Sequence, residues 1–273
     1  MTDTEFCRSS ELPHLEARRS CRENSCYRPH THDAFSLGLI DSGHARLSGP
    51  LDDPVDLDPG DVIVIPAYQV HACNPRRERW EYQMMHLDQD WLAAIHDTEP
   101  RLSMFDRIRV VRDPAASRAV AELCDDVFAD LSADRLAASI REVLSTLALA
   151  DAAHVVGGAP DRIDRFRPVL DRLRDDEANP SLDDLGALVR MDRFQLVREF
   201  KRATGLAPLA WRQNVRVQQA RRLLRDGRSI AETAHHLGFA DQSHFHRVFR
   251  AHVAAAPGMY RDGVQERSRP TAG

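Results

Sequence analysis

The sequence predicts an α+β fold with an N-terminal antiparallel β-barrel, a helical hairpin and a C-terminal all-α domain. Three observations support this fold class. Short apolar runs separated by Gly and Pro turn signals occupy residues 30–88, which is typical of a small barrel or jelly roll. Two amphipathic helical segments follow between residues 114 and 154. A helix-turn-helix pattern then occurs twice in the last third of the chain, and we expect domains at 1–112, 113–156 and 163–262.

Five short apolar runs predict the strands of the barrel. Turn-forming residues separate them, among them Gly43 and the Pro-Gly-Asp string at residues 59–61. The length of 273 residues leaves room for this domain and a second one. The expected strands are residues 35–40, 45–47, 55–57, 62–65 and 82–87.

The middle of the chain predicts a helical hairpin. Pro114 suits the start of one helix, and Ser132 or Asp134 suits the cap of the next. The apolar stripes of the two helices have two alternative uses, packing onto the barrel or forming part of a homodimer interface. The string Gly-Gly-Ala-Pro at residues 157–160 predicts a flexible linker to the last domain.

The two copies of the helix-turn-helix pattern occupy residues 182–200 and 230–249. Their first halves align at an offset of 48 residues and their second halves at 49, so the extra residue falls in the turn. Asp192 and Asp241 are good N-caps for the second helix of each copy. A long helix from Pro208 to about residue 226 is expected to join the copies.

The repeat predicts a DNA-binding module. A helix-turn-helix motif holds its second helix at an angle that lets it enter the major groove. A helical bundle with no DNA role is the alternative, but the duplication and the polar, basic outer faces favour DNA. The predicted DNA-binding residues are Arg193, Phe194, Val197, Arg198 and Arg202 in the first copy and Gln242, Ser243, His246, Arg247 and Arg250 in the second.

The two copies are not expected to read DNA in the same way. The second copy presents hydrogen-bonding side chains to base edges. The first copy has the apolar Phe194 and Val197 at the matching positions, so it should rely on Arg193, Arg198 and DNA shape. Arg202 and Arg250 are expected to meet phosphates.

Charge is distributed unequally along the chain. The net charge of −5 argues against a generic nucleic-acid binder. Residues 161–273, however, hold 21 basic and 15 acidic side chains, a net +6, whereas residues 1–160 hold 16 and 27, a net −11. A basic end on an acidic body is the asymmetry expected of a DNA-binding module joined to a sensing module.

Four strings in the last domain carry a family resemblance: residues 200–208, 216–224, 238–245 and 257–260. They resemble the AraC family of bacterial transcription regulators over roughly residues 165–261. This resemblance implies sequence-specific binding to double-stranded promoter DNA, contact with RNA polymerase and a homodimer that uses part of the hairpin. One departure is Gly186, where Ala is usual and where Gly is expected to make the first copy less rigid.

Two strings in the barrel carry a second resemblance. His30-Thr-His32 precedes a strand, and residues 60–66 lead to His71. They resemble the cupin pattern, and specifically the cupin-like sensor domain attached to many AraC-type regulators, over roughly residues 30–91. Metal-bearing cupins add a Glu where Ser36 stands here. The three imidazoles could still hold Zn²⁺ or another divalent ion, or they could line a ligand pocket or bond within the barrel.

A pocket in the barrel would bind a small-molecule effector. Tyr68 and Trp80 are further candidate lining residues. The predicted effector-binding residues are His30, His32, Asp33, His71, Tyr82 and His86.

The rest of the composition narrows the class of protein. No run of about 18 apolar residues predicts a membrane span, and the N-terminus has no secretory pattern. The five cysteines show no disulfide framework or paired zinc spacing, so we expect reduced thiols and a cytoplasmic protein. The favoured function is an effector-controlled transcription regulator without enzymatic activity. The alternatives are a metal-dependent cupin enzyme with a helical appendage and a helical adaptor that binds protein only.

Overall fold

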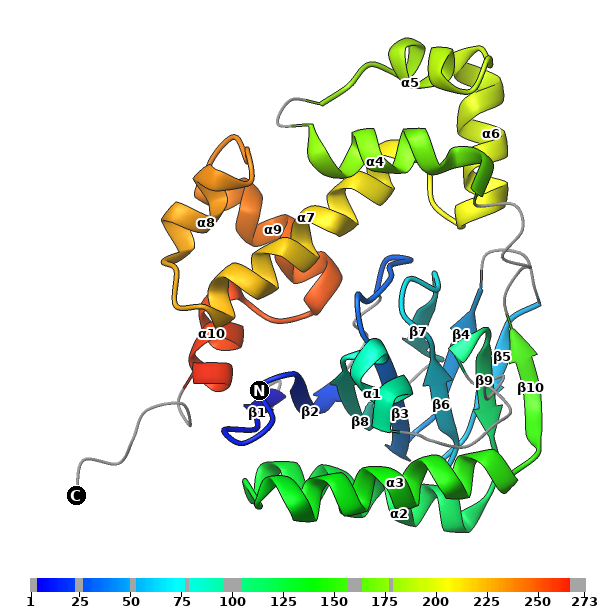
Figure 1. Cartoon of the computed structure of the whole chain (residues 1–273), viewed down its shortest axis with the longest axis vertical. Helices are drawn as coiled ribbons and strands as arrows, with labels where there is room; N and C mark the ends of the chain where they lie inside the picture. Colours follow the sequence, from blue (N-terminus) through cyan, green and yellow to red (C-terminus); the bar gives the residue numbers. More distant parts are fainter. Residues whose placement is uncertain are drawn as a thin grey trace.

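The computed structural model describes residues 4–22, 27–49, 53–76, 79–95, 105–156, 164–176 and 179–265. An N-terminal domain of two β-sheets carries a helical hairpin on one face, and a C-terminal helical domain lies against its other end (Figure 1). The predicted α+β class is therefore confirmed. The expected linker at residues 157–160 lies outside the described residues.

The N-terminal domain is built from two antiparallel sheets. Among the described residues, the larger has seven strands in the order β1-β2-β8-β3-β6-β9-β10, and the smaller has three in the order β5-β4-β7. All five predicted runs form strands, and the described residues contain five further strands that were not predicted. The strands are β1 (Thr4–Arg8), β2 (Leu15–Arg22), β3 (Phe35–Ser42), β4 (Ala45–Ser48), β5 (Val55–Leu57), β6 (Val62–Ile65), β7 (Ala72–Pro75), β8 (Trp80–Leu87), β9 (Ile108–Val111) and β10 (Ala152–Val156).

Both faces of the large sheet are covered, and β6 shows the consequence. Val62 and Val64 face one apolar cluster with the helical hairpin, whereas Ile63 and Ile65 face another cluster that includes the small sheet. A strand buried on both faces is continuously apolar instead of alternating. The run Val-Ile-Val-Ile is therefore the sequence signature of a central strand in this domain.

The hairpin packs onto the sheet. It consists of α2 (Pro114–Phe128), capped by the Asp113 side chain, and α3 (Ala133–Leu149). The apolar stripes of both helices lie in the same cluster as one face of the sheet. The range 113–156 is not wholly helical, since β10 returns from α3 to pair with β9 at the sheet edge. Its Val-Val ending favours a strand, which the helical expectation overlooked.

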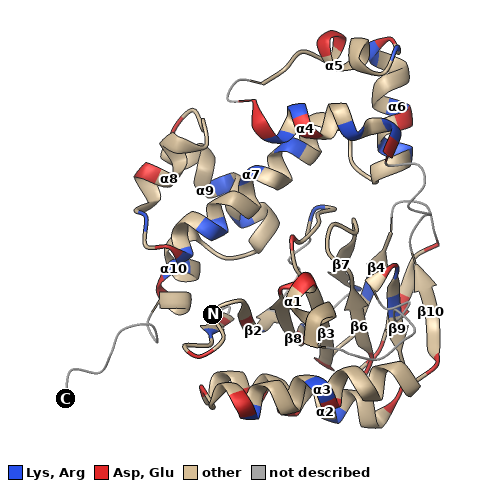
Figure 2. Ribbon diagram, viewed as in Figure 1, with Lys and Arg blue, Asp and Glu red and all other residues tan. Residues whose placement is uncertain are grey.

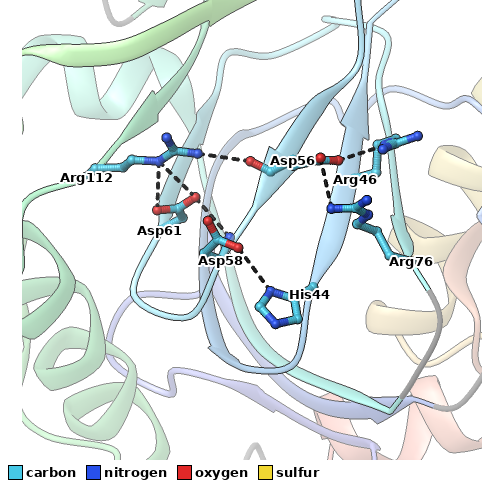
Figure 3. Close-up of polar contacts among 7 residues, drawn as sticks. All are labelled: His44, Arg46, Asp56, Asp58, Asp61, Arg76 and Arg112. Carbon is cyan, nitrogen blue, oxygen red and sulfur yellow. Dashed lines mark hydrogen bonds and ion pairs between the residues drawn. The ribbon is translucent and has the colours of Figure 1, made fainter.

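A set of ion pairs joins the small sheet to the large one (Figure 3). Arg112, which follows β9, donates to the Asp61 carboxylate and to the backbone oxygen of Asp56. The Asp56 carboxylate in turn accepts from Arg46 and Arg76. Except for Asp61 these side chains are substantially exposed, so each pair contributes little to stability. The cluster holds the turn that precedes β6. This strand is the last one before His71 in the sequence.

The C-terminal domain consists of two similar helical units joined by a long helix. The first unit has its own core around Phe166 and Phe200, and the second around Phe245 and Phe249. The predicted joining helix is confirmed as α7, from Pro208 to Arg225. The other helices are α1 (Gln89–Ile95) in the first domain, then α4 (Arg167–Asp175), α5 (Leu182–Leu188), α6 (Arg193–Thr204), α8 (Ile230–His236), α9 (Gln242–Val253) and α10 (Pro257–Gln265).

The turns of both motifs contain a residue with a positive φ, but the residue type differs between them. Gly238 takes a positive φ of 67° in the second turn, and Arg190 takes a φ of 56° at the matching place in the first. A Cβ atom on Gly186 would lie well inside van der Waals contact with the Met191 carbonyl oxygen. Gly186 is therefore required by the tight first turn, which corrects the expectation that it only loosens the copy.

The two domains meet along α7, α9 and α10. Figure 2 shows basic residues along α7, and several of them reach the first domain. Arg222 pairs with Asp33 at 2.6 Å. Phe6 of β1 packs into the core of the second helical unit, with its ring edge-on to Tyr260 at a centroid distance of 5.2 Å. Among the described helices, none is long and apolar enough to cross a membrane.

Candidate DNA-contacting helices and effector cavity

The second helix of each motif is anchored by its cap and its buried face. The Asp192 side chain accepts from the backbone N–H groups of Phe194 and Gln195, and Gln195 completes a capping box. The Asp241 side chain accepts from the His244 backbone N–H. Both predicted N-caps are thus confirmed. The apolar i and i+4 residues of each helix are fully buried, so the opposite faces point to solvent.

The outer face of α6 carries a carboxylate that binds two of the predicted DNA-contacting arginines and that was not predicted from the sequence. Arg198 and Arg202 both donate to the Glu199 carboxylate, at 3.0 and 3.1 Å. The Arg193 guanidinium lies over the ring of Phe194, which is 72% exposed. Two of the predicted cationic contacts are therefore partly neutralised before any DNA arrives. The spacing of three residues between Glu199 and Arg202 was the available signal.

The outer face of α9 is freer. Gln242, Ser243, Arg247 and Arg250 are exposed, and neither arginine has an ion pair among the described residues. His246 differs from this group because its half-buried ring lies edge-on to Phe245 and its Nε2 atom is buried without a protein partner. The second motif therefore offers two uncompensated positive charges where the first offers paired ones.

A cavity of about 60 Å³ lies between the domains. Most of the predicted effector residues line it, namely the three histidines of the cupin-like strings and their neighbours on β8. Its walls come from the sheets and its roof comes from α7 and α9. The lining residues are Phe6, Arg18, Tyr27, His30, Thr31, His32, His71, Cys73, Trp80, Tyr82, Met84 and His86 from the first domain and Asn214, Val217, Gln218, Arg221, His252 and Val253 from the second.

The structure brings His30, His32 and His71 together at one end of the cavity. The ring centroids of His30 and His71 are 4.6 Å apart, and His32 lies 4.9 and 5.0 Å from them. Burial lowers the pKa of all three imidazoles, that of His71 to about 4. His86 lies 4.4 Å from His32 and shares a hydrogen bond of 2.8 Å with Ser36. The cluster is therefore neutral at physiological pH.

The donor set of this cluster fits a divalent metal ion. His30 Nδ1–H donates to the Arg28 carbonyl oxygen at 2.8 Å, and His71 Nδ1–H donates to that of Gln69 at 3.0 Å. These bonds fix the tautomer and leave each Nε2 lone pair available, which is the usual arrangement of metal-ligating histidines. The candidate ligand atoms of the three residues lie within 4.8 Å of one another. Ser36, at the expected Glu position, is fully buried and bonds to His86 instead.

Thr31, which lies between His30 and His32, is hydrogen-bonded to the C-terminal domain. Thr31 Oγ1 accepts from Asn214 Nδ2 at 2.7 Å, and the Thr31 carbonyl oxygen accepts from Gln218 Nε2 at 2.8 Å. Both donors belong to α7. The His-Thr-His string is thereby tied directly to the helix that joins the two motifs.

Two of the candidate effector residues lie elsewhere. Asp33 and the candidate Tyr68 line a separate cleft of about 530 Å³ between the sheet domain and the first helical unit. Asp33 is occupied by Arg222, and Tyr68 is 64% exposed. Asp33 lies in the bend before β3 and lines this cleft, not the histidine cavity. The expectation that these two residues line the histidine cavity is therefore wrong.

Sequence reasoning also missed the charged residues of the cavity. Arg18 on β2 and Arg221 on α7 line it and are 7% and 9% exposed. Arg221 donates to Glu16 at 2.6 Å. No motif spacing marks these residues, since they lie 203 positions apart and meet only when the two domains dock.

Two family models match the chain. That of the AraC-like ligand binding domain matches residues 12–146, which hold most of the sheet domain and its hairpin. That of a helix-turn-helix domain matches residues 185–263, which hold nearly all of both motifs.

Related proteins are transcription regulators. The chain is 25% identical over 241 residues to the uncharacterized HTH-type transcriptional regulator YbfI of Bacillus subtilis, covering 85% of this chain and 86% of that protein. It is 30% identical over 116 residues to the arabinose operon regulatory protein of Escherichia coli, covering 41% and 40%. It is 36% identical over 97 residues to the HTH-type transcriptional regulator MtrA of Neisseria gonorrhoeae, covering 35% and 31%.

Solved structures share the whole fold. ToxT of Vibrio cholerae O395 is 15% identical, with a TM-score of 0.53, and the match covers 96% of this chain and 98% of ToxT. A structure of ToxT with a bound unsaturated fatty acid is 12% identical, with a TM-score of 0.54, covering 99% and 97%. This likeness confirms the arrangement of a sheet domain and a paired helix-turn-helix domain in one chain.

The family resemblance of the sequence strings is thus confirmed at two levels. The two domain models match in the expected order. Regulators of the same type match across most of the chain. The chain belongs to the AraC family of DNA-binding transcription regulators, with an AraC-like ligand binding domain ahead of its helix-turn-helix domain.

Proposed function

We propose that a small-molecule effector in the cavity between the domains controls how this regulator binds its promoter. The observation that carries the proposal is the composition of the cavity, whose walls belong to the ligand-binding domain and whose roof belongs to α7 and α9. An effector there contacts the DNA-binding domain itself. It shifts the relative placement of the two motifs by as much as its affinity differs between their arrangements.

The DNA contacts follow from the exposed faces of α6 and α9. Gln242, Ser243 and Arg247 read base edges, and Arg250 meets a phosphate. His246 contributes only after its half-buried ring turns outward. In the first motif Arg193 and Arg198 act with the apolar Phe194 and Val197, and Arg202 meets a phosphate. Two such helices in successive major grooves, about 34 Å apart, span roughly two turns of DNA for each protomer.

The remaining partners complete the regulatory assembly. We place the protein in the cytoplasm as a homodimer that contacts RNA polymerase at its promoter. The outer face of α3 is the proposed dimer surface, since the inner stripe is used against the sheet and Leu149 is 89% exposed. The relatives are regulators, which supports a regulatory use of the cavity over the catalytic use of a cupin enzyme.

Footprinting and binding titrations test the DNA contacts. Genome-wide mapping of bound sites supplies the target sequence. Arg247→Ala is expected to weaken binding to that site by about 1–3 kcal/mol and to relax specificity at one position. Arg167→Ala, an exposed arginine on α4, is the matched control and should leave affinity unchanged. Unchanged protection and affinity for Arg247→Ala would refute the placement of α9.

The histidine cluster supports a second component of the proposal, a divalent cation held by His30, His32 and His71. Its neutral imidazoles and the fixed tautomers of His30 and His71 favour a metal such as Zn²⁺. The metal would supply a Lewis-acidic point at one end of the cavity. Titration of metal-free protein with Co²⁺, followed by absorbance, should give one ion per chain. His71→Ala should abolish this binding, whereas His154→Ala, on the exposed strand β10, should preserve it. Equal binding by both variants would exclude the cluster.

A further inference from the structure

The cavity contains a buried guanidinium with no carboxylate partner. Arg18 is 7% exposed, lies among the rings of Phe6, Tyr27 and Tyr82 at 5.2–5.9 Å, and forms no ion pair within the described residues. Its Nη groups donate to Ser20 Oγ and to the Val253 carbonyl oxygen, and its Nε atom is buried without a protein partner. A buried charge that lacks an opposite charge is costly.

Two further donors around the cavity share this condition. The Nε atoms of Arg18 and Arg221 and the Trp80 Nε1 atom are all buried and unpaired within the described part of the chain, and all three residues line the cavity. Each buried donor without an acceptor is unfavourable. The cavity therefore has a surplus of N–H donors, and a group that only accepts hydrogen bonds would satisfy it.

The charges around the cavity also favour a ligand that accepts hydrogen bonds, and specifically an anion. Glu16 accepts from both Arg221 and Arg225, at 2.6 and 3.3 Å, so one carboxylate faces two guanidinium groups. Arg18 adds a third positive charge. Asp33 also attracts Arg221 and Arg225, but it is paired with Arg222 outside the cavity and does not cancel the excess. The histidines of the cavity supply no negative charge, so the surplus is positive.

We infer that the effector is a small organic carboxylate whose carboxylate group binds Arg18 and whose apolar body lies against Tyr27, Trp80 and Tyr82. A carboxylate matches the planar guanidinium with two parallel hydrogen bonds and has no donor of its own. The aromatic wall suits an apolar ring or short chain, and a ring requires the α7 and α9 roof to move outward, because the cavity has a volume of about 60 Å³. The inference rests on the proposed function for its regulatory meaning but not for the binding itself.

Arg18 also connects the ligand to DNA recognition. Its Nη1 atom donates at 2.7 Å to the carbonyl oxygen of Val253, the last residue of α9. That oxygen is at the negative end of the helix, where a cation is favourable. A bound carboxylate neutralises the charge of the guanidinium that donates to this carbonyl, and the hydrogen bond loses its charge assistance. Ligand binding therefore weakens one of the contacts that hold the second recognition helix to the ligand-binding domain.

Paired probes of the same shape test the inference without DNA. Thermal unfolding and calorimetry of the full chain would compare benzoate with benzamide and cyclohexanecarboxylate with cyclohexanecarboxamide, in the presence of a chelator to exclude carboxylate binding to a metal. We expect the acids to raise the unfolding temperature saturably and the amides to have no such effect. Equal effects of acid and amide, or no effect of either acid, would overturn the inference.

Variants locate the binding group. Arg18→Gln should lower benzoate affinity about tenfold or more. Arg19→Gln is the matched control, since Arg19 is the next residue on β2 and pairs with the exposed Asp125 on the opposite face. Without ligand, Arg18→Gln should be at least as stable as the parent, because it removes an uncompensated buried charge. A strong loss of stability, or unchanged benzoate affinity, would show that Arg18 is structural.

A failure of carboxylate binding can be distinguished from a failure of the proposed function. Carboxylate binding is measured on protein alone, whereas promoter binding is measured by titration with DNA. If benzoate binds through Arg18 but leaves DNA affinity unchanged, the site stands and its regulatory role fails. If a neutral molecule alters DNA binding while carboxylates do not bind, the cavity stands as a control site and the carboxylate fails.

Discussion

Arg221 of α7 donates a hydrogen bond of 2.6 Å to Glu16 of β2, and this buried contact joins the DNA-binding domain to the ligand-binding domain. The Tyr260 hydroxyl also donates to the Glu16 carboxylate, at 2.8 Å, and Arg225 approaches it at 3.3 Å. One side chain of the first domain thus satisfies three groups of the second. It lies beside the effector cavity, so the stability of the domain junction depends on it.

Replacement of Glu16 should loosen the junction. Glu16→Gln removes the carboxylate that accepts from Arg221 and Arg225, and removal of one partner of a buried pair costs about 3–5 kcal/mol. Chemical denaturation should show this loss in the free energy of unfolding. Asp56→Asn removes an exposed partner of two arginines and should cost less than about 1 kcal/mol. Similar losses for the two variants would mean that the Glu16 pair contributes no more than a surface pair.

The same carboxylate predicts an acid-sensitive junction. Burial alone would raise the Glu16 pKa, but Arg221 and Arg225 outweigh it and lower the pKa from 4.5 to about 2. A lowered pKa in the folded state means that the stabilisation is complete above the ordinary pKa of 4.5 and is lost as the pH falls toward 2. Between about pH 5 and pH 3 the free energy of unfolding should fall more steeply for the parent than for Glu16→Gln. Parallel curves would contradict this assignment.

The sequence predicted the parts of the molecule that depend on local signals. Asp192 and Asp241 cap helices, Pro208 begins one, and the Val-Ile-Val-Ile run is a central strand, because caps and periodic burial act over a few residues. The charged β1 and β2 were missed because half of their pattern faces the other domain. Phe6 and Arg18 are the clearest examples, since each packs against residues more than 200 positions away.

The residues of the candidate site also differ in whether a local signal marks them. His30, His32 and His71 were predictable because a recognised spacing carries them, and the structure places them together. Arg18, Arg221 and Asn214 were not, since each gains its role from tertiary docking. Asp33 was misplaced because its carboxylate pairs with Arg222 of α7, a contact between domains that no local signal marks.

The tight turn of the first motif makes a specific demand at Gly186. Gly186→Ala places a methyl group against the Met191 carbonyl oxygen, and overpacking of this kind costs about 1–3 kcal/mol. Thermal unfolding should show the loss. Gly258→Ala is the matched control, because its Cβ would meet only Ile230 Cδ1 at 3.7 Å, an ordinary contact. A neutral Gly186→Ala variant would show that the turn relaxes without cost.

We expect Glu199 to weaken the DNA affinity of the first motif, so its replacement should raise that affinity. Its carboxylate accepts from both Arg198 and Arg202, so these guanidinium groups give up a protein partner when they bind phosphate. Glu199→Gln should therefore strengthen DNA binding, and the magnitude of the salt slope should grow by about 1 for each additional phosphate that an arginine neutralises. The increase in affinity should be similar on specific and unrelated DNA, since phosphate contacts carry no sequence information. Glu122→Gln on α2 makes the same charge change far from α6, and equal slopes for the two variants would mean that net charge, and not the release of these arginines, controls affinity.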